Sequence, residues 1–179
     1  MNVLDLLLSE ENSGALAEVA KNFNLSEDQT ASAFKELVPA LTRGMQKNTA
    51  STPGLDELLD ALKTGNHSNY VDDPGLLGKT STRDDGNSIL GHILGNKQVS
   101  RDVAGRAAER SGLSSTLLKK MLPIVASLVM GSLGKKVLGS GQTANRGNSG
   151  GLLGMLLDSD RDGAIWDDLL GMGARAMLR

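Results

Sequence analysis

The fold is decided by the stretch Leu117-Leu-Lys-Lys-Met-Leu-Pro-Ile-Val-Ala-Ser-Leu-Val-Met-Gly-Ser-Leu133. Its apolar residues fall on nearly all sides of a predicted helix instead of forming one stripe, and a helix of that kind must be buried. The uncharged run Met121 to Gly134 is shorter than the roughly 20 residues that span a bilayer. We therefore expect a core helix, covered within the fold or by a second copy of the chain, and no transmembrane segment.

A helix and a tight turn precede this stretch, and the same order occurs earlier in the chain. Residues 15–26 align without gaps with residues 103–114, and residues 34–45 align with residues 118–129. Each unit reads as helix, turn and long helix, with a proline at an equivalent place that should kink or divide the long helix. We predict an internal repeat of two helix-turn-helix units.

Composition and turn signals divide the rest of the chain, and no useful β-alternation is present. Ser26 with Gln29 predicts a capping box, and Ser88 to Leu94 and about Ile165 to Leu178 read as helices. The fold class is all-α, with two related helix-turn-helix units and a C-terminal helical hairpin. We expect a first helical unit at 1–63, a connecting segment at 64–88, a second helical unit at 89–138, a flexible linker at 139–150 and a C-terminal helical tail with an Asp-rich loop at 151–179.

Composition excludes several classes of function. The formal net charge is −2, which argues against a general polyanion binder. The chain has no cysteine, so disulfides, thiol catalysis and thiolate metal sites are excluded. The first residues lack a basic region before the apolar stretch, so we expect no signal peptide and a cytoplasmic protein.

The Asp-rich loop is the sharpest candidate site. Carboxylates at its first, third and fifth positions and Gly163 at the sixth match the first half of an EF-hand calcium loop. The twelfth position, which usually supplies a bidentate glutamate, is Leu169. The alternative is an Asp-rich turn that caps the last helix. The candidate Ca²⁺ ligands are Asp158, Asp160, Asp162, the Ala164 carbonyl and Asp168, the last only if the helix start is shifted.

The turn between residues 108 and 118 resembles a DNA-binding helix-turn-helix, because Gly112 comes four residues after Ala108 and is followed by an apolar residue and Ser114. The helix that would enter the major groove offers Lys119 and Lys120 and then becomes almost wholly apolar. These features favour a packing role for this turn over binding of nucleic acid.

Enzymatic signals are weak. His92 lies on a short apolar helix and is expected to be partly buried, whereas His67 lies in a polar loop and is expected to be solvated. No Gly-x-Ser-x-Gly elbow is present, and residues 131–136 lack the spacing of a phosphate-binding loop. We expect no catalytic residues, no bound cofactor and no enzyme.

Several segments together are similar to one bacterial family. The run from Ser88 to Leu113, with Leu117-Leu-Lys-Lys-Met-Leu-Pro123, resembles the YidB-like proteins, which are known chiefly as a domain of unknown function. The stretch Leu16 to Met45 and the Asp-rich ending from Leu157 to Gly171 are also similar. The resemblance implies a homeodomain-like helical arrangement and no assigned activity.

These observations favour a non-enzymatic bacterial interaction or scaffold protein. We expect its partner to be a protein or a second copy of the chain, in a homo-oligomer formed through the helix from Leu117 to Leu133. The first alternative is a calcium-responsive module, in which the loop at 158–168 orders the last helix. The second alternative is a helix-turn-helix regulator that binds DNA.

Overall fold

The computed structural model describes residues 2–139 and 146–157, and every regular element in these two stretches is helical. The all-α fold class predicted from the sequence is therefore confirmed for the described part of the chain. The elements are α1 (Val3–Leu7), η1 (Glu10–Asn12), α2 (Ser13–Phe23), α3 (Glu27–Thr49), α4 (Thr52–Thr64), α5 (Asn69–Asp72), η2 (Pro74–Gly78), α6 (Thr80–Leu94), α7 (Lys97–Ser111), α8 (Ser115–Leu138) and α9 (Arg146–Leu157).

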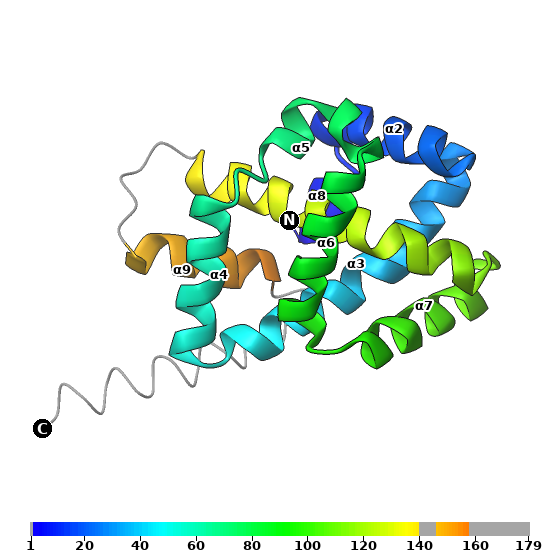
Figure 1. The fold of residues 1–179 in the computed structure, drawn as a ribbon. Helices are drawn as coiled ribbons and strands as arrows, with labels where there is room; N and C mark the ends of the chain where they lie inside the picture. The colour runs from blue at the N-terminus through cyan, green and yellow to red at the C-terminus, as the bar shows by residue number, and fades with distance from the viewer. Residues whose placement is uncertain (1, 140–145, 158–179) are drawn as a thin grey trace, which may run out of the picture.

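The middle of the molecule is occupied by α8 (Figure 1). Every residue from Met121 to Gly134 is buried. By length and composition α8 could cross a membrane, with a mean hydropathy of 1.5, but 83% of its most apolar window is buried inside the fold. The neighbouring helices therefore cover its apolar surface, as expected of a core helix.

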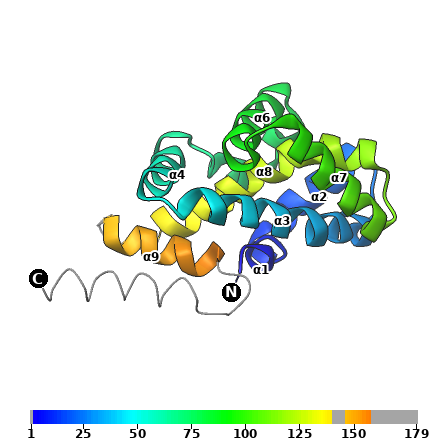
Figure 2. The ribbon, with the colours of Figure 1, turned by 90° about the horizontal axis from the view of Figure 1, so that it is seen from below.

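The other helices are arranged in layers around α3 and α8 (Figure 2). On one side lie α4 and α6, and on the other lie α1 and α9. Because α4 and α6 both pack on α3 and α8, the surface between them is built from four helices, of which only α3 and α4 follow each other directly in the sequence. This arrangement positions the groove described below.

The two predicted turns have similar local structure. Asn24 ends α2 and Gly112 ends α7, both in the left-handed conformation that closes a helix. The side chain of Ser26 accepts from the Gln29 amide in the predicted capping box, and Ser114 caps α8 in the same way. Of the two expected outcomes, a kink or a division, division does not occur, because both long helices continue through Pro39 and Pro123. Packing on both sides of these helices outweighs the lost backbone hydrogen bond.

Two predicted segments differ from the structure. The connecting segment at 64–88 contains α5, η2 and the first half of α6, so the helix expected from Ser88 begins at Thr80. This half of α6 has almost no apolar residues, but Thr82 and Gly86 are buried against the core. The linker expected at 139–150 contains the start of α9 at Arg146. The final helix expected from about Ile165 lies outside the described residues.

Glycine permits the closest approach in the core. A Cβ at Gly86 of α6 would lie 1.9 Å from the carbonyl oxygen of Pro123 in α8, a distance that no real Cβ contact shows. Gly91 of the same helix has nothing within 4 Å of its Cβ position. The two glycines therefore provide a matched pair of substitutions.

We predict opposite effects of alanine at these two positions on the free energy of unfolding. Gly86→Ala should destabilise the protein by about 1–3 kcal/mol, because α6 must move away from α8. Gly91→Ala should stabilise it by up to about 1 kcal/mol through helix propensity. Urea unfolding followed by circular dichroism measures both, and equal effects of the two substitutions would contradict the close packing at Gly86.

Candidate functional site

The predicted calcium ligands cannot be placed. Asp158, Asp160, Asp162, Ala164 and Asp168 all lie outside the described residues. Among the residues that the structure describes, no group of three or more His, Asp or Glu side chains could hold a metal ion. Calcium binding at the Asp-rich loop therefore stays a prediction from sequence.

A groove of about 630 Å³ lies between α4 and α6. Met45 of α3 and Met130 of α8 form its floor, and both are almost completely buried. Ile89 and Ile93 of α6 form one wall. The opposite wall is formed by α4 through Leu58 and Ala61, which are half-buried.

The local sequence explains how these side chains reach the groove. Ile89 and Ile93 are four residues apart and therefore lie on the same face of α6. Gly44 of α3 lets the end of α6 come close, because a Cβ there would lie 2.7 Å from Cγ2 of Ile93. The Asn48 side chain donates hydrogen bonds to the carbonyl oxygens of His92 and Ile93, which joins the end of α3 to the end of α6.

Polar and charged groups lie at the edge of the groove. Glu57 and Asp60 of α4 are exposed, and their carboxylates form no ion pair with any residue of the described part. His92 is also exposed at this edge, so the expectation of a partly buried histidine is wrong. The inward positions of α6 are taken by Ile89 and Ile93, which leaves His92 pointing outward. The site is an apolar floor with a mainly acidic rim.

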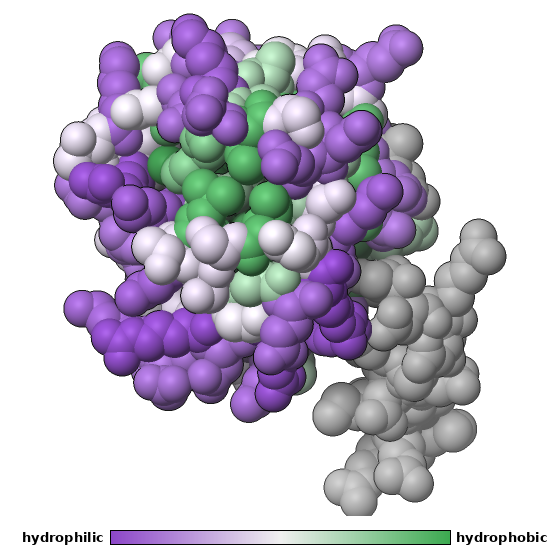
Figure 3. Space-filling view, turned by 90° about the vertical axis from the view of Figure 1, so that its right-hand side faces the viewer, coloured by the Kyte–Doolittle hydropathy of each residue, from purple (hydrophilic) through white to green (hydrophobic). Residues whose placement is uncertain are grey.

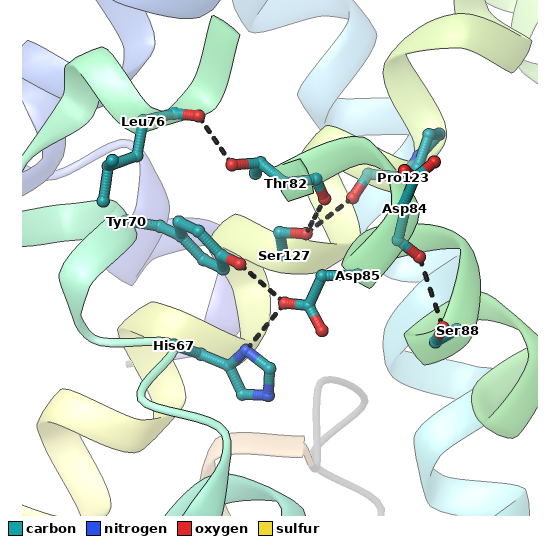
Figure 4. A network of polar contacts seen from close by, with 9 residues as sticks. All are labelled: His67, Tyr70, Leu76, Thr82, Asp84, Asp85, Ser88, Pro123 and Ser127. Atoms are coloured by element: carbon teal, nitrogen blue, oxygen red, sulfur yellow. Dashed lines mark hydrogen bonds and ion pairs between the residues drawn. The ribbon is translucent and has the colours of Figure 1, made fainter. Parts of the chain in front are cut away.

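A polar network lies between α5, α6 and α8 (Figure 4). His67 is 5% exposed, so the expectation of a solvated histidine is wrong as well. Its Nδ1 lies 3.1 Å from Oδ2 of Asp85, an ion-pair distance without the angle of a hydrogen bond. Tyr70 donates a hydrogen bond of 2.7 Å to the same carboxylate oxygen. Burial, followed by this hydrogen bond and the charge of Asp85, raises the pKa of Tyr70 from 10.0 to about 12.

The hydroxyl groups beside this network are committed to the backbone. Thr82 donates to the Leu76 carbonyl oxygen at 2.6 Å. Ser127 of α8 lies within hydrogen-bonding distance of the carbonyl oxygens of Thr82, at 3.1 Å, and Pro123, at 3.0 Å. These contacts hold the polar half of α6 on α8. The hydroxyls of Thr82 and Ser127 are not directed at His67 (Figure 4). We therefore interpret these contacts as joining η2, α6 and α8.

The face at the right of Figure 1 carries an apolar patch surrounded by hydrophilic residues (Figure 3). This end of the molecule contains the turns that join α2 to α3 and α7 to α8. Leu25 and Leu113 follow the left-handed residues of these turns and are half-buried. Lys119 and Lys120 are exposed at the start of α8, but the helix is buried from Met121 onward. Only its first turns could therefore meet a nucleic acid.

Neither the groove nor the polar network was predicted as a site. The sequence placed Met45, Ile89, Ile93 and Met130 on apolar helices, and nothing local indicated that they would meet. The pairing of His67 with Asp85 joins the loop after α4 to the polar half of α6, and the sequence predicts only a connecting segment for both.

Comparison with known proteins gives one family. The family model described as "Bacterial protein of unknown function (DUF937)" matches residues 5–136. No curated protein and no solved structure matches the chain. The matched range contains the whole groove, and it supports the predicted assignment to an uncharacterised bacterial family. The YidB-like name and the homeodomain-like arrangement stay predictions.

Tyr70 is the only tyrosine of the chain, so its titration can be read directly. We predict a phenolate absorbance midpoint near pH 12 in the folded protein and near pH 10.0 in denaturant. Because the folded pKa is raised, the associated stability is fully present below pH 10.0 and is lost as pH rises through about 12. Asp85→Asn should lower the folded midpoint, since it removes the negative charge beside the hydroxyl. An identical midpoint in folded and unfolded protein would refute the half-buried Tyr70–Asp85 contact.

Proposed function

We propose that this chain, which belongs to the DUF937 family of bacterial proteins of unknown function, is a non-enzymatic interaction protein that binds an apolar helical segment of a protein partner in its groove. The groove of about 630 Å³ between α4 and α6 is the observation that carries this proposal. A hollow of this size and chemistry fits the mode in which one face of an amphipathic helix lies in an apolar groove.

The chemistry of the lining favours a protein segment over a small polar metabolite. The floor is formed by Met45 and Met130, and methionine adapts its shape to different apolar side chains. A metabolite site needs several polar groups that converge on the ligand. Here the Asn48 amide is engaged with the backbone of α6, and the carboxylates of Glu57 and Asp60 stand at the rim.

Self-association remains part of the proposal, but through a different surface. The helix from Leu117 to Leu133 was expected to form the contact between copies, yet it lies inside α8 and is buried by the chain's own helices. The groove, in contrast, presents apolar surface at its open side. A second copy of the chain is therefore one of the protein partners that the groove can accept.

The alternative functions rest on fewer observations. A calcium-responsive module is supported by the Asp-rich sequence at 158–168 alone. A DNA-binding regulator is supported by the helix-turn-helix order of α7 and α8 and by the exposed Lys119 and Lys120. Burial of the rest of α8 leaves this helix little surface for the major groove.

We predict that a designed helical peptide with leucines at i, i+4 and i+7 binds in the groove. The full chain with labelled methionine methyl groups should show shifts at Met45 and Met130 and not at the exposed Met155. Leu58→Glu should weaken binding at least about tenfold, because the peptide would desolvate an unpaired carboxylate. Leu113→Glu, at a half-buried leucine of the distant turn, is the matched control and should leave binding unchanged. Absence of shifts at both groove methyl groups would refute the proposed function.

Calcium titration by calorimetry tests the first alternative. If the loop is a regulatory site, the full chain should bind calcium in the micromolar range and Asp160→Ala should abolish the heat. No heat and no change in melting temperature up to millimolar calcium would reduce the Asp-rich loop to a helix cap.

A further inference from the structure

We propose that the groove is occupied by the chain's own residues 165–179. This inference rests on the proposed function, because it identifies the segment that the groove receives. The last described residue, the sequence of the segment and the charges at the rim each support it. The consequence is regulatory, since a protein partner must displace the chain's own segment before it can bind.

The first argument is the place where the described chain ends. Leu157 closes α9 and is buried, and its carbonyl oxygen accepts a hydrogen bond from the Gln46 side chain. Gln46 is the neighbour of Met45, which lies in the floor of the groove. The chain therefore leaves the described structure beside the helix that forms that floor.

The helix that precedes the segment already packs on the helices that build the groove. Besides α3 and α8, α9 contacts α4, which forms one wall. Residues 158–164 can extend over roughly 23–25 Å at 3.3–3.6 Å per residue. A helix with its side chains is about 10–12 Å wide. The intervening residues can therefore span more than the width of one helix.

The second argument is the apolar pattern of the segment. The sequence predicts a helix from about Ile165 to Leu178. Trp166, Leu170 and Met177 fall at i, i+4 and i+11, which places them along one side of such a helix. Side chains of this kind suit a groove with an isoleucine wall and a methionine floor.

The third argument is the match of charge. Glu57 and Asp60 are i and i+3 on α4, and Arg175 and Arg179 are i and i+4 in the segment. Both spacings separate side chains by about 5–6 Å on a helix, so the two pairs can face each other. The segment has no net charge, because Asp167 and Asp168 at its start balance these two arginines in its last five residues, so the match to the acidic rim concerns its C-terminal end. Ion pairs at an exposed rim chiefly determine the orientation of the segment, whereas apolar contact provides the affinity.

Trp166 is the only tryptophan of the chain, so its fluorescence reports on the segment directly. In the full-length wild-type chain we expect a blue-shifted emission and weak quenching by acrylamide. Leu58→Glu should shift the emission to that of an exposed tryptophan, while Leu113→Glu should not. Emission typical of exposed tryptophan in the wild type, with no response to Leu58→Glu, would overturn the inference.

A charge exchange keeps the inference testable if Leu58→Glu impairs folding, because it uses only exposed residues of α4. The double variant Glu57→Arg/Asp60→Arg should weaken docking roughly fivefold, as two rim ion pairs are replaced by repulsion. Adding Arg175→Glu and Arg179→Glu should restore the wild-type emission. Asp56→Arg is the matched control, since Asp56 is exposed on α4 but does not line the groove. Failure of the exchange to restore docking would overturn the pairing.

The outcomes separate this inference from the proposed function. If Trp166 is exposed while the groove methyl groups still respond to the designed peptide, the inference fails and the proposed function stands. If the Trp166 signal depends on protein concentration and sedimentation shows a dimer, docking within one chain is refuted and the occupant is the segment of a second copy.

Discussion

The apolar character of α8 on every side is the constraint from which the rest of the structure follows. A helix that is buried from Met121 to Gly134 has no face that could be left to water. The chain therefore has to supply cover from several directions, and α3, α6 and α7 provide most of it. Close approach is possible because Gly86 meets the Pro123 carbonyl and Gly131 of α8 meets the carbonyl of His67.

Because α6 is partly polar and packs on the apolar α8, its buried polar groups need hydrogen-bond partners. In the first half of α6, Thr82 donates a hydrogen bond to the Leu76 carbonyl oxygen of η2. Asp85 accepts a hydrogen bond from Tyr70 of α5. Ser127 of α8 contacts the Thr82 carbonyl from the other side. Because a buried polar group without a partner costs free energy, these contacts determine where the first half of α6 lies on α8.

The groove is a consequence of this arrangement. The polar half of α6 is held on α8, and the apolar half extends toward the end of α3, where Asn48 bonds to it. Beside α6, α4 also packs on α3 and α8. The space between α4 and α6 is lined by apolar side chains. Both helices belong to the part of the chain that matches the family, and the segment proposed to occupy the groove lies beyond it. A binding surface and its regulator would then be separate parts of one chain.

The sequence by itself determined the all-α class, the buried helix at Leu117–Leu133 and the capping box at Ser26, because these depend on local spacing and composition. The assignment to an uncharacterised bacterial family came from the resemblance of whole segments to known proteins. Only the tertiary structure decided that α6 begins at Thr80, that His67 is buried, that His92 is exposed and that Met45, Ile93 and Met130 share a groove. Hydrophobic periodicity reports which face of a helix is covered, but it does not report which distant helix covers it. Polar residues that enter the core through hydrogen bonds to backbone carbonyls leave no apolar pattern, so the sequence predicts a connecting segment where the first half of α6 lies.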